Sequence, residues 1–507
     1  MLLRELLEPE TIIGSRGDLD RTIGGLAYDS RLVQHGDAFF ALVGHSVDGH
    51  DFVQQAVQYG AAVVFVERDV PVPPETTCVH VENTRQVMAS CAAVFYQHPS
   101  RSLVLVGVTG TNGKTTVTYL LESIFESAGR KCGVLGTISN RYAGATEASA
   151  LTTPESLEIE MIMREMADSG VSCVAMEVSS HALDMGRVAG LDFDGAVFTN
   201  LSRDHLDYHG DLESYFHSKA RLFTDHLPAS HKSKRFAVIN DDDPRGPILV
   251  QDAAAAGVDV VTYGALPASD IHPLHCESDL EGLRGEVQFP NGAVAFASRL
   301  IGQINLENIL AAVGAAWALG LSLQAIQGGL AALEWVPGRL ERIPNELGIT
   351  VLVDYAHTPD ALAKVLGTLR SLSTRKIITV FGCGGDRDRG KRALMGEIAA
   401  AESDLLILTS DNPRTEDPYQ ILDEIERGVA RVELTKRSPS AVTPAPTRGY
   451  WIEPNREAAI HLAVRLARAG DVLLVAGKGH EDYQIVGQRK LPFDDREVLR
   501  REIEQHS

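Results

Sequence analysis

Short apolar runs recur along the chain, and each is followed by a polar loop and then by a helix-like segment. Apolar strands that alternate with helices predict parallel sheets that are covered on both faces. In such sheets ligands bind at the edge where the strands end, so the polar loops hold candidate binding residues. The runs occupy residues 103–108, 171–178, 190–199, 350–353, 377–381, 405–408 and 471–475. The pattern predicts an α/β fold with its chemistry at the carboxyl ends of the strands.

The length of the chain and two punctuated segments predict three domains. A chain of 507 residues favours about three domains at roughly 100–200 residues each. The segment YQHPSRS at 96–102 precedes a predicted strand, and WVPGR at 335–339 interrupts a helical stretch with Pro-Gly. We expect domains at residues 1–100, 101–336 and 337–507. The Ser-, Thr- and Pro-rich segment 437–449 is predicted to be a solvated loop inside the third domain.

The composition argues against several classes of protein. The formal net charge is −21 and aromatic residues make up 6%, whereas proteins that bind nucleic acids are normally basic or rich in stacking aromatic side chains. No run of 18 apolar residues occurs, so no membrane-spanning helix is expected. The six cysteines form no CxxC pair and the start of the chain does not resemble a signal peptide. We therefore expect reduced thiols and a cytoplasmic protein.

A glycine-rich loop between a predicted strand and a predicted helix is typical of phosphate binding. Residues 107–116 read GVTGTNGKTT. Glycines let backbone N–H groups surround phosphate oxygens, Lys114 supplies positive charge, and the Thr115 hydroxyl can bind Mg²⁺. Val108 stands where the pattern GxxxxGK[ST] has glycine, so this is the shorter GxxGKT form. A regulatory GTPase is disfavoured, because the nearest match to its guanine-reading [NT]KxD motif, at 435–438, lacks the aspartate.

Several longer motifs resemble those of the Mur ligase family and follow the order of that family. They are GTNGKT at 110–115, EVSSH at 177–181, NLSRDHLDYH at 200–209, DYAHTP at 354–359 and GKGHE at 477–481. The resemblance covers nearly the whole chain. It implies an N-terminal UDP-binding α/β domain, a central P-loop ATPase domain with a parallel sheet, and a C-terminal Rossmann-like domain that binds an amino acid.

The resemblance also implies a reaction. ATP phosphorylates the side-chain carboxylate of D-glutamate in UDP-N-acetylmuramoyl-L-alanyl-D-glutamate, an amine attacks the acyl phosphate, and amide, ADP and phosphate result. The segment DNPR at 411–414 indicates the family member that adds meso-diaminopimelate during the synthesis of peptidoglycan precursors. We therefore expect an ATP-dependent ligase with small-molecule substrates, which works as a monomer.

By resemblance, residues of the central domain hold ATP and Mg²⁺. The ATP contacts would be Gly110, Thr111, Asn112, Gly113, Lys114, Thr115, Thr116, Asn305 and Arg339. Thr115, Glu177 and His205 would bind Mg²⁺, which prefers oxygen ligands, and Glu177 and His205 would take part in catalysis. Lys219 stands where the family carries a catalytic lysine that CO₂ converts to a carbamate, a further metal ligand. That modification needs a neutral amine first, whereas the local sequence alone predicts a surface lysine on a helix over residues 211–223 that Asp211 caps.

The same resemblance assigns residues to the other two substrates. The UDP-sugar peptide would contact Tyr28, Ser30, His45, Ser46, Val47, Thr152, Thr153, Ser179, Met185 and Arg187. Diaminopimelate would contact Arg387, Asp411, Asn412, Pro413, Arg414, Gly477 and Glu481. Diaminopimelate differs from lysine by one carboxylate, which a planar guanidinium such as that of Arg414 can bind with two hydrogen bonds. Pro413 fixes the local φ and so aims Arg414.

The alternatives are less well supported by the residues. A lysine-adding relative is disfavoured by Arg414, and a folate polyglutamate ligase should lack both the N-terminal UDP-binding segments and residues 411–414. A P-loop switch or a scaffold protein would give no role to the polar clusters that follow the strands of the third domain. In that domain Asp354 and His357 are expected to line the face that meets ATP.

Overall fold

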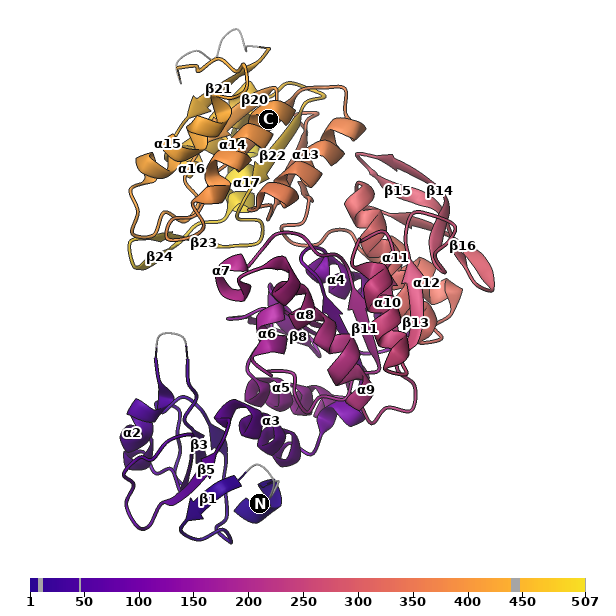
Figure 1. Cartoon of the computed structure of the whole chain (residues 1–507). Helices are drawn as coiled ribbons and strands as arrows, with labels where there is room; N and C mark the ends of the chain where they lie inside the picture. The colour runs from indigo at the N-terminus through magenta and orange to yellow at the C-terminus, as the bar shows by residue number, and fades with distance from the viewer. Residues whose placement is uncertain (8–11, 45–46, 439–446, 507) are drawn as a thin grey trace.

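The computed structural model describes residues 1–7, 12–44, 47–438 and 447–506. His45 and Ser46, two of the predicted UDP-sugar contacts, lie outside the described residues. Figure 1 shows the N-terminal part at one end of the molecule, the P-loop part in the middle and the C-terminal part at the other end. Each part is built around its own mainly parallel sheet, as the recurring apolar runs predict. The domain boundaries after residues 100 and 336 stay a prediction.

The first sheet has the strand order β1-β5-β4-β3-β2. Its strand β1 (Ile12–Arg16) is antiparallel to β5 (Thr77–Val81), and β4 (Val63–Val66), β3 (Ala38–Phe40) and β2 (Leu26–Ala27) continue in parallel. The helices α1 (Leu3–Leu6), α2 (Val53–Gln58) and α3 (Thr84–Phe95) flank it, with a 3₁₀ turn at Gly49–Phe52. Helix α3 begins where the Asn83 side chain accepts a hydrogen bond from the backbone of Gln86. It packs on helix α5 of the central part.

The central sheet has the order β13-β12-β11-β6-β10-β7-β8-β9. The strands from β13 to β7 are parallel, and they comprise β13 (Asp259–Tyr263), β12 (Phe236–Asn240), β11 (Gly195–Phe198), β6 (Val104–Thr109), β10 (Cys173–Glu177) and β7 (Cys132–Leu135). The antiparallel strands β8 (Ser139–Tyr142) and β9 (Ala145–Ala148) complete one edge. Every strand of the parallel part is rich in apolar residues, because helices cover both of its faces.

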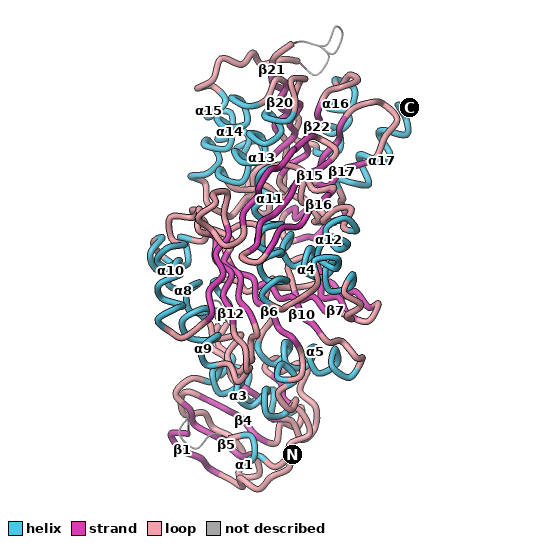
Figure 2. The backbone as a smooth tube through the Cα atoms, turned by 90° about the vertical axis from the view of Figure 1, so that its right-hand side faces the viewer, coloured by secondary structure: helices cyan, strands magenta, loops and turns pink. Residues whose placement is uncertain are grey.

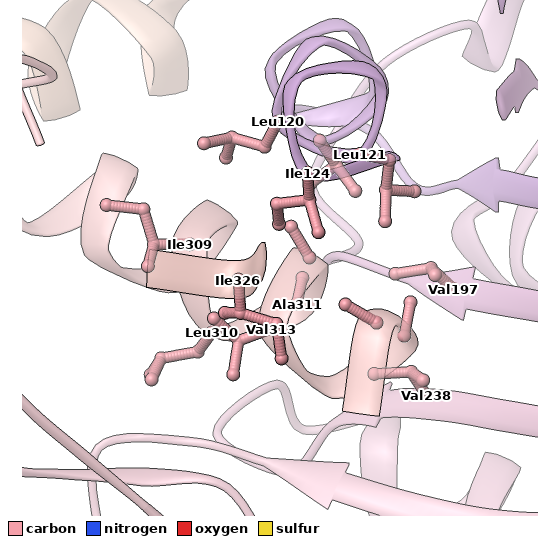
Figure 3. Packing of buried hydrophobic residues seen from close by; sticks show 14 of the residues in the cluster. Leu120, Leu121, Ile124, Val197, Val238, Ile309, Leu310, Ala311, Val313 and Ile326 are labelled. Atoms are coloured by element: carbon pink, nitrogen blue, oxygen red, sulfur yellow. The ribbon is translucent and has the colours of Figure 1, made fainter. Parts of the chain in front are cut away.

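Two hydrophobic cores lie on the two faces of this sheet. On one face α4 (Lys114–Ser127), α11 (Gln303–Ala318) and α12 (Leu323–Ala332) pack together. Figure 3 shows Ile124, Leu310 and Ile326 of these helices in one cluster with Val197 and Val238 of the strands. The other face is covered by α5 (Ser156–Asp168), α6 (Ser180–Asp184), α8 (Leu212–Arg221), α9 (Leu227–Ala229) and α10 (Gly246–Ala255).

Smaller elements surround the central sheet. A 3₁₀ turn (Pro99–Arg101) leads into β6, and the short helix α7 (Leu206–His209) precedes α8. The antiparallel strands β14 (His272–Asp279), β15 (Gly282–Phe289) and β16 (Gly292–Ser298) form a separate sheet, which lies beside α11 and α12 in Figure 2. The predicted cap of α8 is confirmed, because Asp211 Oδ1 accepts a hydrogen bond from the backbone of Ser214 at 2.7 Å. The predicted helix over residues 211–223 ends as an α-helix at Arg221 and continues as a π-helix over Leu222–His226.

The third sheet has the order β17-β18-β22-β19-β20-β21. Strand β17 (Glu341–Ile343) is antiparallel to β18 (Thr350–Asp354), and β22 (Val472–Ala476), β19 (Ile377–Phe381), β20 (Leu405–Leu408) and β21 (Gly449–Ile452) follow in parallel. Helices α13 (Pro359–Leu372), α14 (Gly390–Glu402) and α15 (Pro418–Val429) cover one face, and α16 (Arg456–Leu466) and α17 (Asp495–His506) the other. The hairpin of β23 (Tyr483–Val486) and β24 (Arg489–Pro492) extends from the carboxyl edge.

Two further expectations concern single segments. Residues 439–446 of the predicted loop 437–449 lie outside the described residues, and next to them Arg437 and Tyr450 are joined through their backbones at 2.8 Å. Within the described ranges, no helix has the length and the apolar character needed to cross a membrane.

Candidate active site

The glycine-rich loop follows β6 and is held tightly by the end of β11. Gly110 and Gly113 have φ values of +144° and +89°. A Cβ atom on Gly110 would lie 1.9 Å from Thr199 Oγ1, and one on Gly113 would lie 2.3 Å from Asn308 Oδ1. Asn112 N donates to Asn200 Oδ1 at 3.0 Å, and Thr199 Oγ1 donates to the carbonyl of Asn112 at 2.6 Å. Only glycine fits at these two turns, so the loop keeps one shape.

Two lysines meet at the carbonyl oxygen of Gly110. Lys114 Nζ donates to the carbonyls of Gly110 and Thr111, both at 2.9 Å, and Lys219 Nζ donates to that of Gly110 at 2.8 Å. Lys219 is 1% exposed, and its ammonium lies 4.5 Å from the centre of the Tyr215 ring. Burial, reinforced by the charge of Lys114, holds the pKa of Lys219 well below its usual range. Lys219 is therefore no surface lysine, contrary to what its local sequence predicts.

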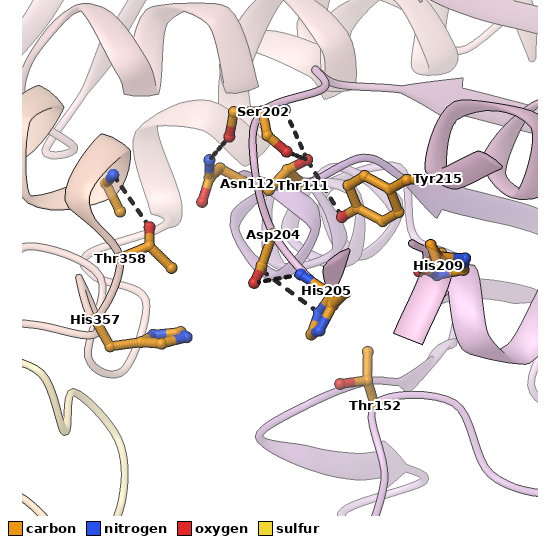
Figure 4. Close-up of polar contacts among 12 residues, drawn as sticks. Thr111, Asn112, Thr152, Ser202, Asp204, His205, His209, Tyr215, His357 and Thr358 are labelled. Carbon is orange, nitrogen blue, oxygen red and sulfur yellow. Dashed lines mark hydrogen bonds and ion pairs between the residues drawn. The ribbon is translucent and has the colours of Figure 1, made fainter. Parts of the chain in front are cut away.

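A cavity of about 280 Å³ joins the glycine-rich loop to the carboxyl edge of the third sheet. It is lined by most of the predicted ATP and metal residues of the central part together with a set from the third part. The first set is Thr111, Asn112, Gly113, Lys114, Thr115, Thr116, Glu177, His205 and Asn305, and the second includes Arg339, Asp354 and His357. Figure 4 shows Asp204 and His205 on one side of this space and His357 on the other.

Glu177 is buried at the end of β10 and has a partner that the sequence did not indicate. Its Oε1 accepts a hydrogen bond from Thr137 N and its Oε2 one from Thr137 Oγ1, both at 2.9 Å. Thr137 Oγ1 also lies 3.0 Å from Thr152 Oγ1. Thr137 therefore orients the carboxylate toward the cavity. Its position after the apolar strand β7 is the signal that could have identified it.

His205 and Asp204 lie in the loop that precedes α7. His205 has a φ of +53°, uncommon for a non-glycine residue. Its backbone N–H donates to Asp204 Oδ1 at 2.9 Å, and its Nε2 lies 3.5 Å from Asp204 Oδ2. Burial lowers the pKa of His205, although Asp204 acts in the opposite direction. A neutral imidazole can offer a lone pair to a metal or to substrate.

The junction between the second and third parts brings Arg339 to the glycine-rich loop. Arg339 Nη2 donates to Thr115 Oγ1 at 3.2 Å, and its guanidinium lies 4.6 Å from the Tyr355 ring. Gly338, with a φ of +64°, lies against the backbone of His480, where an added Cβ would meet the nitrogen at 2.2 Å. Asn112 Nδ2 also reaches Asp360 of α13 at 3.4 Å. The third part thus contacts the loop that would hold the phosphates.

Asn305 and Asn308 lie one helical turn apart on α11. Asn308 Nδ2 donates to Asn305 Oδ1 at 3.1 Å, and Asn305 Nδ2 donates to the carbonyl of Ile301 at 2.9 Å. Both residues line the cavity, and Ile304 lines it with them. The Asn308 amide lies against Gly113 of the glycine-rich loop, and Asn305 holds that amide in place.

The predicted sugar-peptide residues gather between the first and second parts. Thr153 Oγ1 donates to the carbonyl of Glu177 at 2.9 Å and accepts from Ser179 N at 3.0 Å. Arg187 Nη1 donates to the carbonyl of Thr153 at 3.0 Å, and its Nη2 lies 3.4 Å from Met185 Sδ. These contacts bring four predicted residues into one group. Of the remaining described ones, Thr152 lines the cavity beside Thr137, and Tyr28, Ser30 and Val47 belong to the first part, where Val47 is exposed.

Glu155 joins this group to the first part, although its sequence context did not indicate it. The Glu155 carboxylate forms ion pairs with Arg187 and with Arg85 of α3. Tyr28 donates to Glu158 Oε1 at 2.7 Å, a second bond from the first part to α5. Two acids at the start of α5 therefore connect the two parts beside the predicted cleft.

The predicted diaminopimelate residues lie together at the carboxyl edge of the third sheet. Arg414, with a φ of +51°, donates from Nη1 to the carbonyl of Gly385 at 2.7 Å. A Cβ atom on Gly384 would lie 3.0 Å from Arg414 Nη1 and 3.9 Å from Arg387 Cγ, so the two arginines flank this glycine. Arg387 is exposed. Arg387 and Arg414 together form the positively charged end of this set of residues.

Carboxylates form the other end of the same group. Asn412 Nδ2 donates to Glu481 Oε2 at 3.0 Å. Gly477, with a φ of +112°, lies beside Asp411, where an added Cβ would be 3.7 Å from Oδ2. The backbone of Pro413 packs closely on Gly385, because a Cβ atom added to Gly385 would lie 1.9 Å from the Pro413 carbonyl oxygen. An arrangement with cations at one end and anions at the other suits an amphoteric amino acid.

Comparison with known proteins relates this chain to a family of ligases. Family models described as "Mur ligase family, catalytic domain", "Mur ligase middle domain" and "Mur ligase, glutamate ligase domain" match residues 22–96, 108–316 and 338–479. A UDP-N-acetylmuramoyl-L-alanyl-D-glutamate--2,6-diaminopimelate ligase from Geobacter metallireducens is 52% identical over 95% of this chain and 94% of that relative. One from Geobacter sulfurreducens is 49% identical over 98% of this chain and 97% of that relative.

Solved structures agree with these sequence relatives. A structure of a UDP-N-acetylmuramoyl-L-alanyl-D-glutamate--2,6-diaminopimelate ligase covers 100% of this chain and 99% of its own, with 34% identity and a TM-score of 0.70. A MurF ligase from Thermotoga maritima in complex with ADP covers 95% of this chain and 98% of its own, with a TM-score of 0.63. At 19% identity, that second likeness concerns the fold alone.

Proposed function

The chain belongs to the Mur ligase family, and we propose that it is the member that joins meso-diaminopimelate to the D-glutamate side chain of UDP-N-acetylmuramoyl-L-alanyl-D-glutamate. The reaction consumes ATP and supplies a peptidoglycan precursor. One observation carries the proposal beyond the names of the relatives. A single cavity connects the glycine-rich loop to the carboxyl edge of the third sheet, the edge where Arg414 and Glu481 also lie.

The chemistry requires an enzyme that holds a triphosphate close to a carboxylate. The D-glutamate carboxylate attacks the γ-phosphorus of ATP, ADP leaves, and an acyl phosphate forms. The amine of diaminopimelate then attacks the acyl carbon, and collapse of the tetrahedral intermediate releases phosphate. Lys114 and Arg339 line the cavity from two sides and offset the negative charge of the transferring group. The contact between Arg339 and Thr115 would yield to the nucleotide.

Magnesium fits the oxygen donors at this site. Thr115 and Glu177 line the same cavity, and hydroxyl and carboxylate oxygens suit a hard cation that keeps several waters. His205 lies on the cavity wall and is the third candidate ligand. When bound, Mg²⁺ would offset the negative charge of the phosphate groups. Thr137 supports the binding of the cation by fixing the Glu177 carboxylate.

Lys219 meets the chemical requirement for carbamylation. A carbamate forms only from the neutral amine, and burial next to Lys114 lowers the pKa of Lys219 in the direction that favours this form. The product is an anion beside Lys114, in place of two cations that share one carbonyl oxygen. As a carbamate, Lys219 would supply an oxygen ligand for the metal.

The choice of amino acid rests on Arg414, which lies where a distal carboxylate could be bound by two hydrogen bonds. Lysine lacks that carboxylate and would leave the guanidinium without a partner. We expect the protein to act in the cytoplasm, where ATP is available, and to work as a monomer.

The first experiment measures phosphate release from ATP, Mg²⁺ and UDP-N-acetylmuramoyl-L-alanyl-D-glutamate with either meso-diaminopimelate or L-lysine as acceptor. Release with diaminopimelate alone is expected. Release with lysine alone would keep the family and overturn the specificity. Release with neither acceptor would refute the proposed substrate pair.

A further inference from the structure

Lys478 is a fully buried lysine at the centre of the proposed amino-acid site, and neither its sequence context nor the family motifs assigned it a role. Its side chain is 0% exposed. It lies in the turn after β22, between Gly477 and Gly479, both of which have positive φ values. A buried ammonium is costly unless it is paired and hydrogen-bonded, so the partners of Lys478 indicate what it is for.

Those partners all belong to the residues predicted to bind diaminopimelate. Lys478 Nζ donates to Glu481 Oε2 at 2.8 Å and to Asn412 Oδ1 at 3.3 Å, and it lies 3.6 Å from Asp411 Oδ1. The first partner comes from the turn after β22, and the other two come from the loop after β20. One ammonium group therefore joins the two loops that form this end of the site.

The contacts also fix how each partner is turned. Asn412 Oδ1 accepts from Lys478 and from the backbone of Ile485 at 2.9 Å, so its Nδ2 must face Glu481, to which it donates at 3.0 Å. Both contacts to Glu481 involve Oε2. In the described part of the chain no hydrogen bond reaches Glu481 Oε1, and the buried Asp411 Oδ1 has only its ion pair with Lys478. Glu481 Oε1 therefore remains for a ligand with N–H groups.

Lys478 also adjusts the charge at this end of the site. Without it, Asp411 and Glu481 would face each other as two partly buried carboxylates that repel. With it, the three groups carry one net negative charge, which suits one ammonium group of an amino acid. Arg414 reaches the same network through the loop of Gly385, whose N–H donates to the carbonyl of Asn412 at 2.9 Å.

We propose that Lys478 is a positioning residue for the amino-acid substrate, holding Glu481, Asn412 and Asp411 so that the free carboxylate oxygen of Glu481 binds an ammonium group of diaminopimelate. The inference rests on the proposed function, because it assumes that diaminopimelate binds between these carboxylates and Arg414. It predicts that loss of Lys478 impairs the use of one substrate only.

The test replaces Lys478 with methionine, which has a similar length and no charge. Lys478→Met should raise the KM for diaminopimelate roughly tenfold or more, the size expected when hydrogen bonds to charged groups are lost. The KM values for ATP and for the UDP-sugar peptide should stay within roughly twofold of wild type. Lys490→Met is the matched control, since Lys490 is exposed on the hairpin of β23 and β24 and lies 3.7 Å from the Tyr483 ring that Lys478 also faces. It should leave all three values unchanged.

A double-mutant cycle separates positioning from a general structural role. If Lys478 acts through Glu481, Lys478→Met should add little to the KM increase in a Glu481→Gln background, because the two losses are not additive. Additive losses, or an unchanged KM in Lys478→Met, would overturn the proposal. If Lys478→Met does not fold, Lys478→Arg decides in the same way, since its guanidinium cannot repeat both contacts. Wild-type protein that released no phosphate with diaminopimelate would instead refute the proposed function.

Discussion

Arg414 is the residue on which the choice of amino acid depends. Its backbone is fixed at a φ of +51° and is paired on both sides with the hairpin, through Ile485 and Gly487. Its Nη1 already donates to Gly385, so the guanidinium is preoriented before a ligand arrives. A preoriented fork loses little entropy when it binds a carboxylate.

Replacing Arg414 with alanine should weaken the use of diaminopimelate and leave ATP unaffected. The loss of a charge-assisted pair corresponds to about 1.5–3 kcal/mol, or roughly 10- to 150-fold in kcat/KM. The measurement is phosphate release at varied diaminopimelate and then at varied ATP. An unchanged kcat/KM for diaminopimelate would remove the role given to Arg414.

Lys219 shows how a single buried amine can be tested for a chemical modification. Lys219→Ala should lower kcat at least roughly 100-fold, because the carbamate oxygens are lost near the transferring phosphoryl group. Added formate or acetate should restore part of the activity, since a small carboxylate can occupy the vacated space. Lys219→Arg should stay inactive with or without these anions, because a guanidinium neither forms a carbamate nor leaves room. Full activity of Lys219→Ala would refute the carbamate.

At the scale of elements, helix α5 carries a buried glutamate, Glu160, for which the described residues provide no ion pair. Glu160 is 1% exposed, and in the described residues neither of its carboxylate oxygens has a hydrogen-bond donor. Burial raises its pKa to about 8, with Asp192 acting in the same direction and Arg101 against it. Arg101 is already paired with Asp192 at 2.9 Å, so it offers little compensation.

The stability of α5 and its surroundings should therefore fall as the pH rises. Glu160 keeps its proton in the folded protein up to about pH 8 and loses it in the unfolded chain near its ordinary pKa of 4.5. Between these values the folded state binds more protons, so the free energy of unfolding decreases by at most about 1.4 kcal/mol per pH unit. Glu160→Gln removes this slope.

Thermal unfolding at several pH values would measure the effect of Glu160. The Tm of Glu160→Gln should exceed that of wild type by a margin that grows from pH 5.5 to pH 8. Glu165→Gln, on the exposed side of the same helix, serves as the control and should not change the pH dependence. A constant difference between Glu160→Gln and wild type would contradict the prediction.

At the scale of the whole molecule, the junction between the second and third parts decides whether the cavity is complete. The turn at Gly338 packs directly on Gly479 and His480, and it carries Arg339 to Thr115. Gly479, with a φ of +55°, would clash through a Cβ with the side chain of Tyr355 at 2.7 Å. The close approach of these glycines holds the third part against the ATP site.

Gly338→Ala should separate this junction. The new Cβ would meet the backbone of His480 at 2.2 Å, so Arg339 should shift and kcat should fall roughly tenfold or more. Gly348→Ala is the matched control, because Gly348 has a similar φ of +69° but its nearest neighbour would be 3.5 Å away. The control introduces a similar backbone strain at a positive φ but no clash with a neighbouring segment. Equal losses of kcat in the two variants would show that strain, and not the junction, accounts for the effect.

The sequence by itself determined the features that depend on neighbouring residues. Apolar runs followed by polar loops predicted seven of the parallel strands, with β19 and β20 at their observed bounds and the other five displaced by a few residues. The glycine-rich loop and the Asp211 cap were also predicted from the sequence, because each depends on a few consecutive residues. Four of the five family motifs contribute residues to the cavity, because each lies where a strand ends.

Only the tertiary structure decided the environment of each side chain. Lys219 is buried because α8 packs against the glycine-rich loop, more than a hundred residues earlier in the chain, and its local sequence predicts the opposite. Glu155, Thr137 and Lys478 gained their roles from partners on distant segments, which no local pattern reports. Burial and pairing arise from packing between elements, so they set the charge state and orientation of residues whose positions the sequence had already fixed near the site.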